Sequence, residues 1–236
     1  MTDTPPPLLS GTLYLVATPI GNLEDITLRA LRVLRECDVV AAEDTRRTRQ
    51  LLQHFNIKKP IVSCHQFNES KRSTGLIRKL ESGEIIALVS DAGTPGISDP
   101  GERLVRATLA ANQKVEPVPG PCAAIAALSA AGLPTAQFFF AGFPPHKSGQ
   151  RRKQLTTLAA IPGTLVFYES PHRILKLLGE LSEIWPESNV VIGRELTKKF
   201  EEFHRGTPPD ILSHMTKHKP RGEFVVLVGE PRTPKL

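Results

Sequence analysis

Apolar runs and amphipathic segments alternate along the first half of the chain. Short apolar runs predict five buried strands, at residues 12–17, 38–42, 61–64, 85–89 and 115–118. Apolar residues at helical spacing, as at Leu28, Leu31 and Leu34, predict helices that begin near residues 27, 45, 69 and 102. Strands separated by helices of this length favour a parallel sheet. We therefore expect an α/β fold in which residues 11–117 form an N-terminal domain with a mostly parallel, doubly wound sheet.

The second half of the chain has a different pattern. Strands are predicted at 138–143, 164–168, 189–195 and 223–228, and helices at 150–160, 171–185 and 210–217. We expect residues 121–230 to form a C-terminal domain with a mixed α/β sheet. The Pro- and Gly-rich segment Pro117–Pro121 marks the boundary between the domains. The segments 1–10 and 231–236 are expected to be flexible tails.

The helix predicted at residues 122–131 directly follows this boundary. It contains six alanines, and Pro121 suits the first turn of a helix. Such a small-residue surface allows another group to pack very close to it.

The charge of the chain is unevenly distributed. The 236 residues have a formal net charge of +6. Residues 1–116 hold 15 Lys and Arg against 14 Asp and Glu, whereas residues 117–236 hold 15 against 10. A basic half favours a polyanionic partner such as nucleic acid, although solubility alone also explains a modest excess. Aromatic residues make up 6% of the chain, which argues against a surface that stacks many bases.

The three cysteines lie far apart, at Cys37, Cys64 and Cys122, without any CxxC pair. This spacing predicts neither a zinc site nor a disulfide framework, and we expect no bound metal and a reducing, cytoplasmic environment. No apolar stretch approaches the length of a membrane span, so we expect no membrane partner.

A loop dense in Gly and Pro follows the predicted strand at 85–89. Three Gly and two Pro occur within residues 93–101, and Asp91 and Asp99 supply acceptors or caps. Gly93 and Gly96 would let a ligand approach the backbone, at the strand end where open α/β sheets bind ligands. The loop is neither a GxxxxGK[ST] nor a GxGxxG motif, which argues against a nucleotide triphosphatase or a simple dehydrogenase. An ordinary strand–turn–helix connection remains the alternative.

Four further polar segments follow predicted strands, at residues 17–27, 42–49, 166–173 and 192–202. Taken singly, each also fits turn chemistry, a helix cap or a solvated charged face. The segment at 166–173 contains Ser170 and His172 but no GxSxG elbow, so it does not predict a hydrolase triad.

Five of these motifs occur in one order that closely resembles the ribosomal RNA small subunit methyltransferase I family, within the tetrapyrrole methylase superfamily. The motifs are the segments Ala17–Thr27, Ala42–Arg46, Ser90–Gly101, Pro119–Pro121 and Tyr168–Arg173. Each turn is common by itself, whereas the five in register are specific. The resemblance covers roughly residues 11–230.

The resemblance implies a two-domain tetrapyrrole-methylase-like fold with a methyl donor, S-adenosyl-L-methionine, in the cleft between the domains. Family members methylate the ribose 2′-hydroxyl of a cytidine in the decoding centre of bacterial 16S rRNA, usually as homodimers. By the same match, the donor site would be lined by Thr18, Pro19, Gly21, Asp91, Gly93, Thr94, Pro95, Gly96, Pro121, Ala123 and Ala124.

Methyl transfer from a sulfonium is an in-line displacement, so such an enzyme mainly has to align donor and acceptor. A ribose hydroxyl is a poor nucleophile until its proton is drawn off, which requires a positioned base or an electrostatic substitute. The candidate bases are Glu43, Asp44 and Glu169. Catalysis by alignment alone is the alternative.

The predicted RNA contacts are basic or imidazole side chains at the same strand ends: Arg46, Arg47, His172, Arg173 and Arg194. A cytidine must be exposed before its ribose can be reached, so we expect the ordered 30S ribosomal subunit to be part of the substrate.

Other functions remain open at this point. A tetrapyrrole methylase of the same superfamily fits less well with the basic second half and the arginine clusters. A non-catalytic RNA-binding module would leave the Gly/Pro loop without a purpose. Methylation of a modified translation factor is a weaker possibility.

Overall fold

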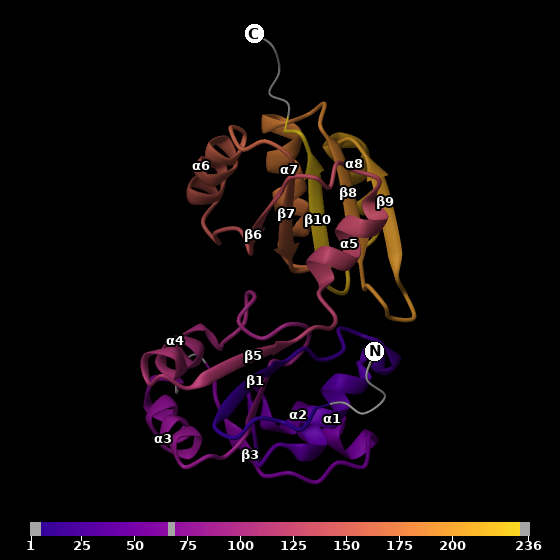
Figure 1. The fold of residues 1–236 in the computed structure, drawn as a ribbon. Helices are drawn as coiled ribbons and strands as arrows, with labels where there is room; N and C mark the ends of the chain where they lie inside the picture. The colour runs from indigo at the N-terminus through magenta and orange to yellow at the C-terminus, as the bar shows by residue number, and fades with distance from the viewer. Residues whose placement is uncertain (1–5, 66–68, 232–236) are drawn as a thin grey trace. The chain divides into compact units, whose positions relative to one another are not determined.

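The computed structural model describes residues 6–65 and 69–231. The chain folds into two compact units, Met1–Cys122 and Ala123–Leu236 (Figure 1). Each unit holds one five-stranded sheet with helices packed against it. The division falls at the end of the segment rich in Pro and Gly.

The first unit is built on a parallel sheet. Its strands are β1 (Thr12–Val16), β2 (Val39–Ala42), β3 (Ile61–Ser63), β4 (Ile86–Val89) and β5 (Lys114–Val118). Their order is β3-β2-β4-β1-β5, and every neighbouring pair is parallel. The carboxyl ends of all five strands therefore lie at one edge, where an open α/β sheet places its ligand-binding loops.

Helices cover both faces of this sheet, as a doubly wound fold requires. They are α1 (Leu28–Glu36), α2 (Thr45–His54), α3 (Glu69–Glu81) and α4 (Glu102–Ala110), with a short 3-10 helix, η1 (Leu23–Asp25). Leu34 of α1 and Leu52 of α2 pack with Tyr14 on one face. Leu80 of α3 and Leu104 of α4 pack on the other face. Because side chains alternate between the two faces along each strand, the strands contribute to a hydrophobic core on each face of the sheet.

The second unit has a mixed sheet. Its elements are α5 (Ala123–Ala131), β6 (Phe138–Gly142), α6 (Ser148–Leu158), β7 (Thr164–Glu169), α7 (Ile174–Ile184), β8 (Asn189–Arg194), β9 (Glu202–Gly206), α8 (Pro208–Met215) and β10 (Phe224–Gly229). The order is β6-β7-β10-β8-β9, with only the β6–β7 pair parallel among these strands. Side chains of α6, α7 and α8 share one core with this sheet, centred on Phe167 and Trp185. The predicted fold class, a parallel sheet followed by a mixed one, is confirmed.

Two local predictions differ from the structure. The sequence pattern predicts no strand at β9, which begins where the charged segment 192–202 ends. Strand β9 pairs antiparallel with β8, and Glu202 lies opposite Arg194. Helix α7 begins at Ile174 and not at Pro171, because the N-cap residue Arg173 has φ and ψ angles of −125° and −17°, outside the helical range.

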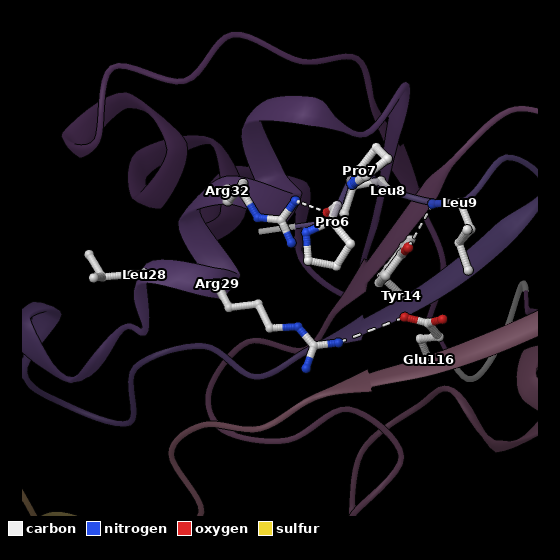
Figure 2. A pocket seen from close by; sticks show the side chains of 9 residues that line it. All are labelled: Pro6, Pro7, Leu8, Leu9, Tyr14, Leu28, Arg29, Arg32 and Glu116. Atoms are coloured by element: carbon white, nitrogen blue, oxygen red, sulfur yellow. Dashed lines mark hydrogen bonds and ion pairs between the residues drawn. The ribbon is translucent and has the colours of Figure 1, made fainter. Parts of the chain in front are cut away.

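The described part of the predicted N-terminal tail is held against the first unit (Figure 2). Arg32 Nη1 donates to the Pro6 carbonyl at 2.9 Å, and the Leu9 N–H donates to Tyr14 Oη at 3.0 Å. These contacts lie at a cavity of ≈ 550 Å³. The remaining predicted tail residues, 1–5 and 232–236, lie outside the described residues.

A buried ion pair joins α6 to α7 in the second unit. Arg151 Nε and Nη2 donate to the two carboxylate oxygens of Glu180 at 2.6 and 2.7 Å. The two side chains are only 3% and 9% exposed. Arg151 Nη1 also donates to the carbonyls of Pro145 and His146, at 3.0 and 3.1 Å, so the pair holds the loop after β6.

We predict that Glu180→Ala destabilises the second unit by about 3–5 kcal/mol, because it leaves the buried Arg151 guanidinium unpaired. Trp185 is the single tryptophan of the chain and lies in this core, so its fluorescence during urea unfolding reports on this unit. Glu183→Ala is the matched control, since Glu183 also lies on α7 and pairs with Arg152 at a partly exposed position. That control should change stability by less than about 1 kcal/mol. Equal effects of the two changes would contradict the prediction.

Candidate functional site

The loops after β1 and β4 are joined by their backbones. The N–H of Thr18 donates to the Gly93 carbonyl, and the N–H of Gly93 donates to the Thr18 carbonyl, both at 2.9 Å. The Thr18 hydroxyl also donates to the Ser90 carbonyl at 3.2 Å, and Thr18 is buried. Two turns that are far apart in the sequence are thereby held as one surface at the carboxyl edge of the sheet.

The path of the β4 loop depends on glycine. Gly93 and Gly96 have φ angles of 83° and 81°, which side chains rarely adopt. A Cβ atom at Gly96 would meet nothing within 4 Å, so this stretch of backbone faces open space. The Gly96 N–H donates to the Pro100 carbonyl at 3.2 Å, which closes the turn.

The segment after β5 lies against the same two loops. The Thr94 hydroxyl donates to the Pro121 carbonyl at 3.1 Å. A Cβ atom on Gly120 would lie 2.9 Å from the Ala17 Cβ, so the absence of a side chain there permits the close approach. Of the predicted donor residues in the first unit, Thr18, Gly93, Thr94 and Pro121 are thus brought together by direct hydrogen bonds. Pro19 and Gly21 follow Thr18 in the β1 loop, and Pro95 lies between Thr94 and Gly96.

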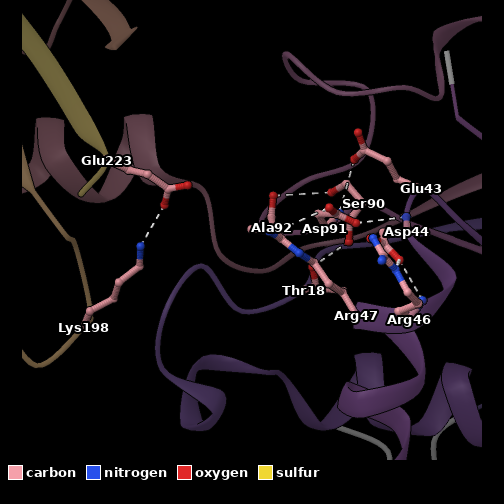
Figure 3. A network of polar contacts seen from close by, with 10 residues as sticks. All are labelled: Thr18, Glu43, Asp44, Arg46, Arg47, Ser90, Asp91, Ala92, Lys198 and Glu223. Carbon is pink, nitrogen blue, oxygen red and sulfur yellow. Dashed lines mark hydrogen bonds and ion pairs between the residues drawn. The ribbon is translucent and has the colours of Figure 1, made fainter. Parts of the chain in front are cut away.

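Carboxyl groups from the ends of β2 and β4 meet beside this surface (Figure 3). The Asp44 N–H donates to Asp91 Oδ1 at 3.0 Å, and the Asp91 N–H donates to Glu43 Oε2 at 3.4 Å. The other oxygen of Asp91 lies 3.4 Å from Arg47 Nη1. The neighbouring strands β2 and β4 therefore place three acidic residues in one network.

Crowding and burial change the proton affinity of two carboxyl groups. Burial, with the nearby Asp91 charge, raises the pKa of Glu43 above its ordinary value. Burial, followed by the charge of Glu43, raises the pKa of Asp99 to about 6. Both groups hold a proton more readily than a solvated carboxylate does.

Asp44 is in the opposite situation. Its side chain caps α2 by accepting from the Arg46 N–H at 2.8 Å, and it accepts from Arg46 Nε and Nη2 at 3.1 and 2.7 Å. These hydrogen bonds from Arg46 hold the pKa of Asp44 well below its usual range. Asp44 is therefore a helix cap and a poor proton acceptor.

Glu169, the third candidate base, lies in the second unit with a fully buried side chain. Its Oε1 accepts from the Ser170 N–H at 2.7 Å, and its Oε2 lies 3.0 Å from Arg173 Nη2. Arg173 also donates to the Pro144 carbonyl and lies 3.3 Å from the His146 ring. This arrangement links the β7–α7 turn to the loop after β6. His172 is exposed on the same turn.

Other predicted site residues of the second unit lie elsewhere in that unit. Arg194, at the end of β8, donates to the Arg221 carbonyl at 2.6 Å and pairs with Glu202. Ala123 and Ala124 begin α5, and the Ala124 N–H donates to Tyr168 Oη at 3.1 Å.

Sequence reasoning missed two anchoring roles. Tyr168 holds the start of α5, although its motif suggests only a strand end. Ser90 accepts the Thr18 hydroxyl through its carbonyl, a role that any residue type fills and that no side-chain pattern signals.

Two classes of feature are absent from the described residues. No group of three or more His, Cys, Asp or Glu there is placed to hold a metal ion. The same residues contain no helix that is both long and apolar enough to cross a membrane.

Comparison with known proteins identifies the family of this chain. The family model for tetrapyrrole (corrin/porphyrin) methylases matches residues 12–211. Ribosomal RNA small subunit methyltransferase I of Pseudomonas aeruginosa is 50% identical over 230 residues, which cover 96% of this chain and 81% of that protein. The protein of the same name from Escherichia coli O157:H7 is 51% identical over 221 residues, with 92% and 77% covered.

A solved structure has the same fold. It is uroporphyrin-III C-methyltransferase from Thermus thermophilus in complex with S-adenosyl homocysteine, with a TM-score of 0.64 and 22% identity. The alignment covers 93% of this chain and 97% of that one. The resemblance inferred from the five sequence motifs is confirmed: this chain is a methyltransferase that belongs to the tetrapyrrole (corrin/porphyrin) methylases and, among them, to the ribosomal RNA small subunit methyltransferase I family.

Proposed function

We propose that this chain transfers a methyl group from S-adenosyl-L-methionine to the RNA of the small ribosomal subunit. The observation that carries the proposal is 50% identity over 96% of the chain to a relative named for that activity. The family resemblance supports the finer part of the proposal. The acceptor is the 2′-hydroxyl of a decoding-centre cytidine in 16S rRNA, the substrate is the 30S subunit, and the enzyme is a cytoplasmic homodimer.

The residues at the carboxyl edge of the first unit fit a donor of this kind. S-adenosyl-L-methionine supplies a methyl group on a positively charged sulfur, together with a cationic amino group. The open space beside the Gly96 backbone leaves room for close approach, and Glu43, Asp91 and Asp99 give the edge a negative charge that complements a cation. The Thr18–Gly93 backbone pair holds the two loops in one geometry, and alignment is the main requirement of in-line transfer.

Glu43 is the base that the electrostatics favour for the ribose hydroxyl. Asp44 is committed to Arg46 and to capping α2, and Glu169 is buried against Arg173. Glu43 is only partly buried, and burial with the Asp91 charge raises its pKa. A carboxylate with a raised pKa accepts a proton more readily than an ordinary one does.

Arg46 and Arg47 are placed to contact RNA phosphates. Arg46 is 83% exposed although it pairs with Asp44, and Arg47 is 66% exposed although it pairs with Asp91. A guanidinium has five N–H donors, so each keeps donors for a phosphate after its carboxylate contact.

The substrate class is tested by methyl transfer from labelled S-adenosyl-L-methionine into 30S subunits that lack the modification. Naked 16S rRNA and uroporphyrin III serve as parallel acceptors. We expect label at a cytidine 2′-O position of the subunits. Label in uroporphyrin III alone would instead favour a tetrapyrrole methylase, and donor binding without transfer to any acceptor would contradict the proposed reaction.

Removing the base should slow the chemical step. We predict that Glu43→Gln lowers the single-turnover rate by about 10²–10⁴-fold, the usual contribution of general base catalysis. The dissociation constant for S-adenosyl-L-methionine, from isothermal titration calorimetry, should change little. Asp44→Asn is the control next in sequence and should affect the rate less. A near-normal rate for Glu43→Gln would leave alignment alone as the source of catalysis.

Asp99 should make the stability of the fold depend on pH. Its pKa is about 6 in the folded state against an ordinary 3.8, so between these values the folded chain keeps a proton that the unfolded chain releases. The free energy of unfolding therefore falls as pH rises from about 4 to about 6, and stays lower above that range. Asp99→Asn should be more stable than the wild type at pH 8, by about 1 kcal/mol after allowing for solvent screening.

Urea unfolding followed by circular dichroism at pH 4, 6 and 8 measures this difference. Glu102→Gln, an exposed change at the start of the next helix, is the control and should keep the wild-type pH profile. A stability difference between Asp99→Asn and the wild type that does not vary with pH would rule out the titration of Asp99 as the cause.

A further inference from the structure

A cavity of ≈ 370 Å³ in the first unit adjoins the proposed site of methyl transfer. Thr18 and Asp91 line one side of it, and both also belong to the network at the carboxyl edge. Arg47, Gln50 and His54 of α2 line the other side. The roles proposed for the donor loop and for Glu43 do not involve Gln50 or His54, so the α2 side of this cavity has no function assigned by them.

The α2 side chains at the cavity form one face of the helix. Arg47, Gln50, Leu51 and His54 are spaced three, four and seven residues from the first, which brings them onto one side. The cap by Asp44 fixes the start of α2. This face is therefore held in a set position relative to the strand ends.

The chemistry of the cavity wall suits a flat ligand with polar edges. Pro19, Leu23 and Leu51 supply apolar surface, and Leu23 is 40% exposed. The Gln50 amide both donates and accepts hydrogen bonds, and the His54 ring offers a stacking face. A phosphate alone would make no favourable contact with these apolar side chains.

Asp91 lines the cavity, whereas the α2 residues beside it are basic and suit a polyanion. Arg46, Arg47 and Arg49 all lie in the first half of α2, and the side chains of Arg46 and Arg47 are largely exposed. A ligand that combines a flat, apolar-faced ring with a negatively charged backbone is a nucleotide of single-stranded RNA.

We propose that this cavity holds one unstacked nucleobase of the RNA substrate, next to the nucleotide that is methylated. Gln50 hydrogen-bonds the edge of the base, His54 and Leu23 pack against its faces, and the arginines of α2 contact the adjoining phosphates. The inference rests on the proposed function and adds a residue-level basis for RNA selection, because sequence-specific RNA recognition reads splayed bases.

The test compares Gln50→Ala and His54→Ala with Gln53→Ala. Gln53 is an exposed glutamine on the same helix that does not line the cavity, so it is a matched control. We measure KM and kcat for 30S subunits and, separately, the dissociation constant for S-adenosyl-L-methionine. Gln50→Ala and His54→Ala should each raise KM for the subunits by about tenfold, in line with the loss of one base contact. Gln53→Ala should not.

The dissociation constant for S-adenosyl-L-methionine distinguishes the possible outcomes. Wild-type donor affinity in all three variants shows that the carboxyl edge is intact. KM values equal to that of Gln53→Ala would overturn the nucleobase site and leave the proposed function standing. Donor affinity that falls as much as the affinity for subunits would also overturn it, because α2 would then serve the donor. Absence of RNA methylation by the wild type would remove the proposed function itself.

Discussion

The pair of backbone hydrogen bonds between Thr18 and Gly93 is the constraint on which the site depends. It joins the loops that follow β1 and β4, two neighbouring strands of the parallel sheet. A backbone pair of this kind needs no particular side chain on Thr18, but it needs the left-handed conformation of Gly93. Pro121 is then attached through the Thr94 hydroxyl, so hydrogen bonds hold three loops together.

The same sheet order produces the electrostatics of the site. Because β2 lies beside β4, Glu43 at the end of one strand is close to Asp91 and Asp99 after the other. Burial at this edge, followed by the like charges gathered there, raises the pKa of Glu43 and of Asp99. The parallel arrangement thus supplies a pre-aligned loop and a group of readily protonated carboxyls together. One feature, the order of the parallel strands, therefore accounts for both the loop and the carboxyl groups.

The sequence predicted the sheet type and the Gly/Pro turns at the strand ends, because apolar runs and Gly/Pro turns are local signals. It did not predict what each acidic side chain contacts. Asp44 and Glu43 are adjacent and equivalent as sequence signals, yet one caps α2 and the other faces Asp91. Strand β9 was missed for a related reason. Its stability comes from pairing with β8 and not from an apolar pattern of its own.

The spacing in sequence between each candidate base and a following arginine helps to explain the role of that base. Asp44 is followed two residues later by Arg46, and Glu169 four residues later by Arg173, and each acid pairs with its own arginine. Glu43 is also followed four residues later by an arginine, but Arg47 pairs across the sheet edge with Asp91 instead. That long-range competition removes the local partner of Glu43. Burial, followed by the charge of Asp91, raises the pKa of Glu43, and the charge of Arg47 opposes this rise only in part, so contacts between strand ends decide the proton affinity of Glu43.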